Sequence, residues 1–334
     1  MTHIVDTVTN HTRLRRNRKA DWSRRLVREN TVTPDDLIWT FFLIEGENAT
    51  EPVGSMPGVV RYTVDRAIEA VKEAYDLGIP AVAPFANPPI EKRNETGSHI
   101  LDADNVVNRF IREMKSVLPD VGVITDVALD PFTDHGHDGI LRDGKIINDE
   151  TVNVLMKAAV AQADCGTDVI APSDMMDGRI GAIRRALDDA GHQDVSIMSY
   201  TAKFASAFYG PYREAINTAG LLKGDKKTYY VDPANRHDAI REAERDVAEG
   251  ADMLMVKPGL PYLDVCRDLK DRFQMPTFAY QVSGEFAMIQ AAAQNGWIDG
   301  GRIIQETMMC FKRAGCDGIL TYFAPEIAKA LTVQ

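Results

Sequence analysis

Short apolar runs alternate with longer amphipathic segments along the chain from about residue 35 onward. Eight of these runs are rich in β-branched and aromatic residues and predict strands: 37–44, 79–85, 121–127, 168–173, 195–200, 253–257, 276–282 and 318–322. Segments 65–77 and 235–249 have apolar residues at helical spacing, and Gly78 and Gly250 follow them, as is typical of helix C-termini. Alternating strands and helices imply parallel strands joined by right-handed crossovers. Eight such strands predict an α/β fold of the closed (β/α)8 TIM-barrel type.

An open, doubly wound sheet is the alternative fold. It is disfavoured because no G-x-G-x-x-G follows the first predicted strand and no G-x-x-x-x-G-K-[ST] occurs. The sequence therefore divides into an N-terminal arm at 1–34, which is polar and has no core pattern, and a barrel at 35–334. We expect the arm either to extend freely or to contact a neighbouring subunit.

The charge balance restricts the partners. The chain has 38 Lys and Arg residues against 49 Asp and Glu residues, a net charge of −11, which disfavours nucleic acid and anionic membranes. The basic stretch at 13–28 leaves a small nucleic-acid-binding arm as an alternative. The chain begins with no apolar segment and contains no run of about 18 apolar residues, which predicts a cytoplasmic protein.

Polar residues stand where the predicted strands end, and TIM-barrel active sites lie at that end of the barrel. Lys257 ends an apolar strand, so its amine would lie in the barrel mouth, where burial and a neighbouring cation both lower the pKa of an ammonium. Lys203 follows the preceding strand and would be that cation. A Lys257 that extends to solvent is the alternative. The pair of amines predicts Schiff-base chemistry on a carbonyl substrate.

Two further segments carry candidate chemistry. Segment 204–227 is expected to form a lid, because its glycines permit hinges, its aromatic residues exclude water, and Arg213 and Lys226 are suited to a substrate carboxylate. An exposed loop is the alternative. Segment 125–139 is dense in acidic residues and histidines without a cysteine, so its oxygens suit magnesium, or hydrogen-bond to one another, rather than a thiolate-bound zinc.

Six segments together resemble one enzyme family: MVKPG at 255–259, SYTAK at 199–203, FYGPYR at 208–213, APSDMMDGR at 171–179, YQVSGE at 280–285 and LTYF at 320–323. On these segments, and over essentially the whole chain from Arg13 onward, the sequence resembles the porphobilinogen synthase (5-aminolaevulinate dehydratase) family. The resemblance implies a lyase that condenses two 5-aminolaevulinate molecules to porphobilinogen with loss of two waters, an early step of tetrapyrrole synthesis.

The resemblance also implies roles for single residues. Lys257 would form a Schiff base with the substrate that becomes the propionate side, and Ser283 and Tyr322 would hold the carboxylate of that substrate. Lys203 would serve the other substrate.

Further residues would contact this second substrate or the reacting groups. Arg213 and Lys226 would hold its carboxylate, and Asp126 and Ser173 would contact the reacting amino end. Phe208 belongs to the matching lid motif and is expected to contact substrate. Tyr230 departs from the family pattern, which has a glutamine facing the second carboxylate; a phenol still donates one hydrogen bond.

The metal-binding positions differ from those of the zinc-dependent members. Ala128, Asp130 and Asp138 stand where these members carry three cysteines, so the chain resembles the aspartate-rich class without catalytic zinc. This leaves magnesium, a monovalent cation such as potassium, or no ion, with Asp130 and Asp138 as weaker metal candidates. Glu242 matches the ligand of an allosteric magnesium in many members, and a solvated helix acid is its alternative.

The family also implies self-association. The arm of one subunit contacts a neighbouring barrel in a homo-octamer built from dimers, with a hexamer as the other assembly. Two other functions remain as alternatives, a class I Schiff-base aldolase and a non-catalytic barrel scaffold. The aldolase is disfavoured by the two lysines, the two sets of carboxylate-binding residues and the absence of an evident glycine-rich phosphate site.

Overall fold

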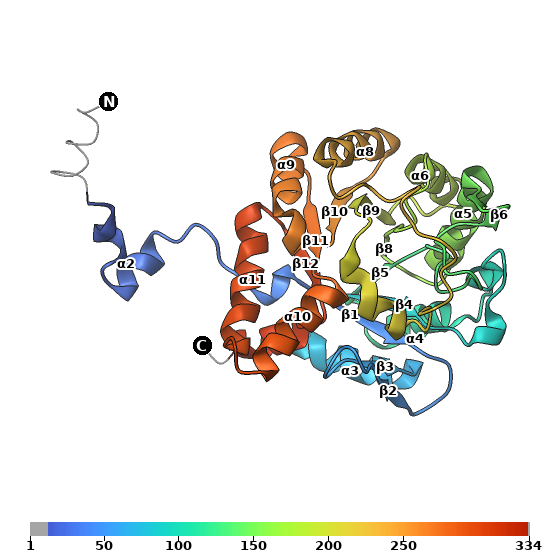
Figure 1. Cartoon of the computed structure of the whole chain (residues 1–334). Coiled ribbons are helices and arrows are strands. Elements are labelled where there is room, and N and C mark those ends of the chain that lie inside the picture. The colour runs from blue at the N-terminus through green and yellow to red at the C-terminus, as the bar shows by residue number, and fades with distance from the viewer. Residues whose placement is uncertain (1–12, 333–334) are drawn as a thin grey trace.

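The computed structural model describes residues 13–332, and its centre is a closed barrel of eight parallel strands (Figure 1). The barrel strands are β1 (Leu37–Leu43), β4 (Ala81–Ala86), β5 (Gly122–Thr125), β8 (Val169–Ile170), β9 (Ser196–Lys203), β10 (Met253–Lys257), β11 (Thr277–Tyr280) and β12 (Gly318–Thr321). They pair in this order, and β12 pairs back onto β1, with Leu37 opposite Ile319. The predicted TIM barrel is therefore confirmed in all eight strands, and the open sheet is wrong.

Helices surround the barrel (Figure 1). They are α3 (Val64–Asp76), α4 (Val106–Val117), α5 (Asn148–Asp164), α6 (Arg179–Asp189), α7 (Gly210–Ala215), α8 (Arg236–Glu249), α9 (Leu263–Phe273), α10 (Ser283–Gln294), α11 (Gly300–Ala314) and α12 (Ala324–Thr332). Short 3-10 turns connect them at η2 (Pro34–Asp36), η3 (Ile90–Lys92), η4 (Ser98–Leu101), η5 (Ala207–Tyr209) and η6 (Leu260–Tyr262). The two helices predicted from spacing are α3 and α8. Gly78 and Gly250 follow them with φ of 92° and 105°, which a residue with a side chain rarely adopts.

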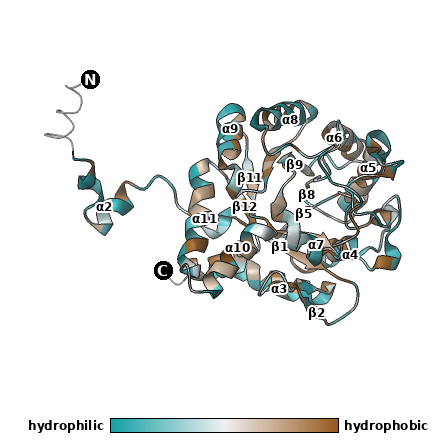
Figure 2. Ribbon diagram, in the orientation of Figure 1, coloured by the Kyte–Doolittle hydropathy of each residue, from teal (hydrophilic) through white to brown (hydrophobic). Residues whose placement is uncertain are grey.

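The hydrophobic core lies between the strands and the inner faces of the helices. Every residue of β1 is buried, as expected for a parallel strand covered on both sides. Figure 2 shows the complementary pattern, with hydrophilic residues over much of the outer helices α8 and α9. The rigid strands thereby fix the positions of the residues at their C-terminal ends.

Four small strands were not predicted. The hairpin of β2 (Thr50–Pro52) and β3 (Val60–Tyr62) extends the sheet beside β1, and β6 (Leu141–Arg142) pairs with β7 (Lys145–Ile146). The β6–β7 turn holds Asp143 and Gly144 at φ of 49° and 75°, so the Asp-Gly dipeptide was an available hairpin signal.

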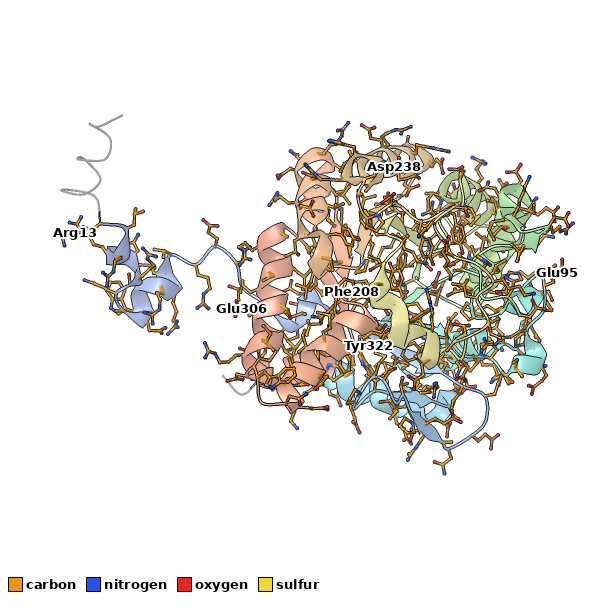
Figure 3. All side chains as sticks on the ribbon, viewed as in Figure 1. Arg13, Glu95, Phe208, Asp238, Glu306 and Tyr322 are labelled. Atoms are coloured by element: carbon orange, nitrogen blue, oxygen red, sulfur yellow. The ribbon has the colours of Figure 1, made fainter. Side chains whose placement is uncertain are left out.

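The described part of the arm contains η1 (Leu14–Arg18) and α2 (Asp21–Leu26) and lies apart from the barrel (Figure 1). Figure 3 shows Arg13 on this segment, away from the side chains of the barrel. The predicted arm begins at residue 1, and its first twelve residues lie outside the described ones. Trp22 is 63% exposed, an unusual value for tryptophan. Among the described helices, none has both the length and the apolar composition needed to span a bilayer.

Candidate active site

The two candidate lysines lie side by side at the ends of neighbouring strands. Lys203 on β9 is the register partner of Lys257 on β10, so both side chains leave the same face of the sheet. Lys203 is only 3% exposed and Lys257 only 4%. β9 continues three residues beyond the predicted strand because it keeps pairing with β10 up to this point.

Both lysines line one closed cavity at the barrel mouth. Its other walls come from segments that are distant in the sequence: Asp130, Gly136, Tyr209, Tyr212, Arg213, Thr218, Leu222, Lys226 and Tyr230. Its volume is about 30 Å³, which leaves room for only a few water molecules. A substrate is therefore admitted only when part of the wall moves.

Aromatic rings surround the Lys257 amine. Five ring centroids lie within 6 Å of its Nζ, at 4.7 Å for Tyr280, 5.1 Å for Tyr200, 5.3 Å for Tyr212, 5.7 Å for Tyr209 and 5.8 Å for Phe85. Burial in this enclosure, followed by the charge of Lys203, lowers the pKa of Lys257 to about 7. The amine is therefore substantially neutral near neutral pH, as a nucleophile on a carbonyl must be.

Lys203 has a different environment, because it is bound by a carboxylate. Its Nζ donates to Asp138 Oδ1 at 2.9 Å and to the Ser173 carbonyl at 2.5 Å, and it lies 4.4 Å from the Tyr230 ring centroid. The two neighbouring lysines thus differ in state: Lys257 is held among rings, and Lys203 in an ion pair.

Asp138 joins several of the predicted residues. Lys226 Nζ lies 2.5 Å from its Oδ2, and the Tyr229 and Tyr230 hydroxyls donate to it at 3.0 and 2.8 Å. Burial alone would raise the pKa of Asp138, but the Lys203 and Lys226 ammoniums outweigh it and hold that pKa well below its usual range. The carboxylate is charged across the physiological pH range and pairs with both ammonium groups.

This arrangement does not fit the predicted metal role of Asp130 and Asp138. The Asp138 oxygens already accept from two ammoniums and two phenols, and Asp130 lies 3.6 Å from Lys226. Burial also raises the pKa of Asp130, which favours its neutral form. A divalent cation at Asp138 would have to displace the Lys226 ammonium group and would lie next to the positive charge of Lys203.

Asp126 and Ser173 lie next to the Lys203 end of the cavity. The Ser173 hydroxyl donates to Asp126 Oδ2 at 2.7 Å, and its backbone N–H donates to Asp126 Oδ1 at 3.1 Å. Because the Ser173 carbonyl accepts from Lys203, this pair is tied to the second lysine, although neither residue lines the cavity.

Three predicted substrate contacts also lie off the cavity. The Ser283 hydroxyl accepts from the Tyr212 N–H at 2.9 Å, and the Tyr322 hydroxyl lies 3.0 Å from that of Tyr280. Phe208 lies in η5, near the centre of the barrel face in Figure 3. In this closed arrangement, substrate contact by Ser283, Tyr322 and Phe208 stays a prediction.

The predicted lid, 204–227, is partly helical, with η5 and α7 followed by a loop across the cavity. Two buried arginines hold it from below. Arg61 on β3 donates to the carbonyls of Glu214 and Ala215 at 2.8 and 2.6 Å, and Arg93 donates to the Ile216 carbonyl at 2.7 Å. The lid rests on fixed donors, and Arg213 within it reaches the cavity while forming no salt bridge among the described residues.

Sequence reasoning missed the aromatic enclosure, the Tyr229 contact and the two buried arginines. The signal for the enclosure was the aromatic residue in several strand-end motifs, such as Tyr200 and Tyr280. Arg61 stood between Val60 and Tyr62 in a short apolar run, an unusual place for a charge.

Glu242 lies apart from this site, on α8. It lines a surface hollow of about 640 Å³ together with Asp177 and Asp238, the latter at the barrel rim in Figure 3. Burial and then Asp246 raise the pKa of Glu242. Among the described residues, no three His, Cys, Asp or Glu side chains are grouped as a metal site.

A closed (β/α)8 barrel with a buried lysine of lowered pKa next to an ion-paired lysine on the adjacent strand is typical of one class: enzymes that act on carbonyl substrates through amine nucleophiles.

The comparisons with known proteins agree. Residues 11–330 match the family model "Delta-aminolevulinic acid dehydratase". The protein of that name from Bradyrhizobium diazoefficiens is 58% identical over 96% of this chain and 91% of its own, and that from Rhodobacter capsulatus is 52% identical over 96% of both. A solved delta-aminolevulinic acid dehydratase (porphobilinogen synthase) from Toxoplasma gondii, in complex with the product porphobilinogen, superposes with a TM-score of 0.93 at 45% identity over 95% of this chain and 91% of that one. The chain belongs to the delta-aminolevulinic acid dehydratase family and is a lyase, so the aldolase and scaffold alternatives are not supported.

The state of Lys257 gives a testable pH dependence. With a pKa of about 7, half of its amine is neutral at pH 7, against roughly one in 3,000 for an ordinary lysine of pKa 10.5. We expect reductive labelling of Lys257 by levulinate and cyanoborohydride to rise about tenfold per pH unit below pH 7 and to level off above pH 8. Levulinate lacks an amine, so its own titration does not enter.

Lys227 is an internal reference for this measurement, because its side chain is 76% exposed. Its labelling should keep rising with pH. Peptide mass mapping at each pH separates the two sites, and a Lys257 profile that followed that of Lys227 would contradict a depressed pKa.

Proposed function

We propose that the chain condenses two molecules of 5-aminolaevulinate to porphobilinogen with loss of two waters, and that Lys257 and Lys203 each bind one substrate through its ketone. The observation that carries this proposal is the adjacency of two buried amines in different states. Two reacting carbonyls held on neighbouring strands are positioned for each other without further diffusion.

The difference between the amines supports an order of events. The Lys257 amine is free to attack a ketone, expelling one water as the imine forms. The Lys203 amine is held by Asp138 and by the Ser173 carbonyl, and these contacts have to break before it can attack. The first substrate therefore binds at Lys257 and the second at Lys203.

The cavity residues suggest how the second substrate is held. Arg213 offers a bidentate fork to its carboxylate, and Lys226 stands beside it. The Tyr230 hydroxyl donates to Asp138 in the closed structure, so it serves the carboxylate only if it turns away from Asp138.

Porphobilinogen formation tests this proposal. The purified chain, incubated with 5-aminolaevulinate, should produce a pyrrole that is detected with acidic dimethylaminobenzaldehyde and identified by mass spectrometry. Consumption of 5-aminolaevulinate without a pyrrole, or no consumption by folded protein, would contradict it.

We further propose that turnover needs no zinc and that magnesium acts at Glu242. The first part is supported by the cavity lining, in which the described residues include no cysteine. Support for the second is that magnesium keeps several waters and is bound by one or two carboxylates, which Glu242 and Asp177 offer at the hollow beside α8. A monovalent cation is the other candidate for an ion effect.

A zinc-selective chelator should leave activity within about twofold of the untreated protein, and magnesium should raise it severalfold. Glu242→Ala should lose the magnesium response. Glu244→Ala, on the same helix but paired with Arg272, is the matched control and should keep it. Activity that is lost to the chelator and restored only by zinc would contradict turnover without zinc. An undiminished magnesium response in Glu242→Ala would contradict magnesium binding at Glu242. Replacing potassium by tetramethylammonium separates a monovalent effect.

We also propose that the protein is cytoplasmic and assembles with copies of itself through the arm, as a homo-octamer built from dimers or as a hexamer. Support comes from the apolar residues that the arm exposes beside its basic ones: Leu14, Trp22, Leu26 and Val27. Native mass spectrometry of the full chain and of a Trp22→Ser variant measures the assembly, which the substitution should weaken.

A further inference from the structure

The first turn of α10 lies directly against the lid. A Cβ added at Gly284 would stand 2.3 Å from the carbonyl oxygen of Phe208 and 2.8 Å from its C and Cα, whereas real Cβ atoms essentially never come within 3.0 Å of another heavy atom. These are backbone atoms, and the Phe208 N–H is itself held by the Ser206 hydroxyl at 3.1 Å. No side-chain rotation relieves such an overlap.

Space, rather than backbone conformation, requires glycine at this position. Gly284 is not among the described glycines with positive φ, so an alanine could adopt its backbone angles. The absent side chain therefore serves the close approach of η5 to the helix.

The preceding residue makes a polar contact with the same lid. Ser283 accepts from the Tyr212 N–H at 2.9 Å, in the first turn of α7. A hydroxyl has two acceptor lone pairs and one proton, so this contact leaves the Ser283 proton free to donate. One hydroxyl can thus hold the lid and a carboxylate at the same time.

Docking of η5 and α7 also completes the surroundings of the Lys257 amine. It places the Tyr209 and Tyr212 rings within 6 Å of the Lys257 amine and carries Arg213 to the cavity. A lid displaced from α10 would leave Lys257 exposed to water on that side.

We propose that Ser283 and Gly284 form the seat on which the lid closes, and that lid closure and carboxylate binding at Ser283 stabilise each other. Gly284 is a positioning residue, because it acts through the lid. The coupling rests on the proposed function, since it takes Ser283 to bind a substrate carboxylate; the seat itself does not. By reciprocity, a ligand that binds better to the closed form must favour closure.

The test uses Gly284→Ala in the full chain with Gly301→Ala as its matched control. Both glycines are the second residue of a helix, and a Cβ at Gly301 would meet nothing closer than 3.8 Å. Amide hydrogen exchange of residues 207–219 reports lid seating, with and without levulinate as a carboxylate-bearing probe.

We expect Gly284→Ala to speed amide exchange in 207–219 at least tenfold without ligand and to abolish the protection that levulinate gives the wild type. The pH midpoint of Lys257 labelling should rise by about one unit, because water reaches the amine. Gly301→Ala should match the wild type in all three. Ser283→Ala, which removes the acceptor without adding atoms, should speed exchange at the Tyr212 amide and covers the case that Gly284→Ala does not fold.

If the folded variants exchanged the amides of 207–219 at the wild-type rate and kept the wild-type pH midpoint of Lys257 labelling, Ser283 and Gly284 would not form the seat of the lid. If levulinate slowed exchange equally in the wild type and in Ser283→Ala, the coupling between lid closure and carboxylate binding at Ser283 would be wrong, while the seat itself would stand. Failure of the proposed function has a different signature, because it would remove levulinate labelling of Lys257 in the wild type and leave the ligand-free exchange difference intact.

Discussion

Lys257→Ala should reduce porphobilinogen formation below about a thousandth of the wild-type rate, because the neutral amine that attacks the first ketone is removed and no nearby group replaces it. Lys203 lies beside it but is ion-paired to Asp138. The side chain lies among aromatic rings, so its loss removes no salt bridge and the variant should fold.

Initial rates of pyrrole formation measure this effect. Lys257→Met keeps the volume of the side chain and should be equally inactive, which separates the amine from packing. Lys72→Ala, at an exposed position of α3, is the control and should retain full activity. Turnover in Lys257→Ala above about a thousandth of wild type would contradict the nucleophile role.

Lys203→Ala should lower turnover at least a hundredfold, because the second ketone loses its amine. Asp138 keeps Lys226, Tyr229 and Tyr230 as partners, so its charge is not left unpaired and the fold should persist. The charge of Lys203 also lowers the pKa of Lys257, so its removal should move the labelling of Lys257 to higher pH.

Two measurements separate the lysines. Lys203→Ala should still form a reducible adduct at Lys257, whereas Lys257→Ala should not form one at position 257 and should not turn over. A Lys203→Ala variant with wild-type turnover would limit the chemistry to one amine and contradict the two-lysine account.

The periodic parts of the sequence allowed the barrel and the lysine pair to be predicted. Strand ends in a parallel barrel meet at one face, so Lys257 and Lys203 could be brought together from spacing alone. Their different states could not, because the lowered pKa of Lys257 depends on rings from β4, β9, β11 and the lid, whose packing has no sequence period.

The contacts of Asp138 also could not be predicted from the sequence, because they join loops that are distant along the chain. The sequence left it as a metal ligand or a hydrogen-bond acceptor, and its partners Lys203 and Tyr230 lie 65 and 92 residues away. Only the folded structure shows that the ammonium groups of Lys203 and Lys226 already bind the Asp138 carboxylate. The lid was predicted from its glycines and aromatics. Its support by Arg61 required the β2–β3 hairpin, and its support by Arg93 required the loop that follows η3; the pattern indicated neither.

Borohydride trapping detects the Schiff bases at the two buried lysines directly. Chelator-treated protein would be incubated with 5-aminolaevulinate, reduced, digested and mapped by mass spectrometry, with and without added magnesium. We expect a reduced adduct at Lys257, with or without a second at Lys203, and none at exposed lysines such as Lys227. Folded protein that forms no adduct at either buried lysine under both conditions would contradict it.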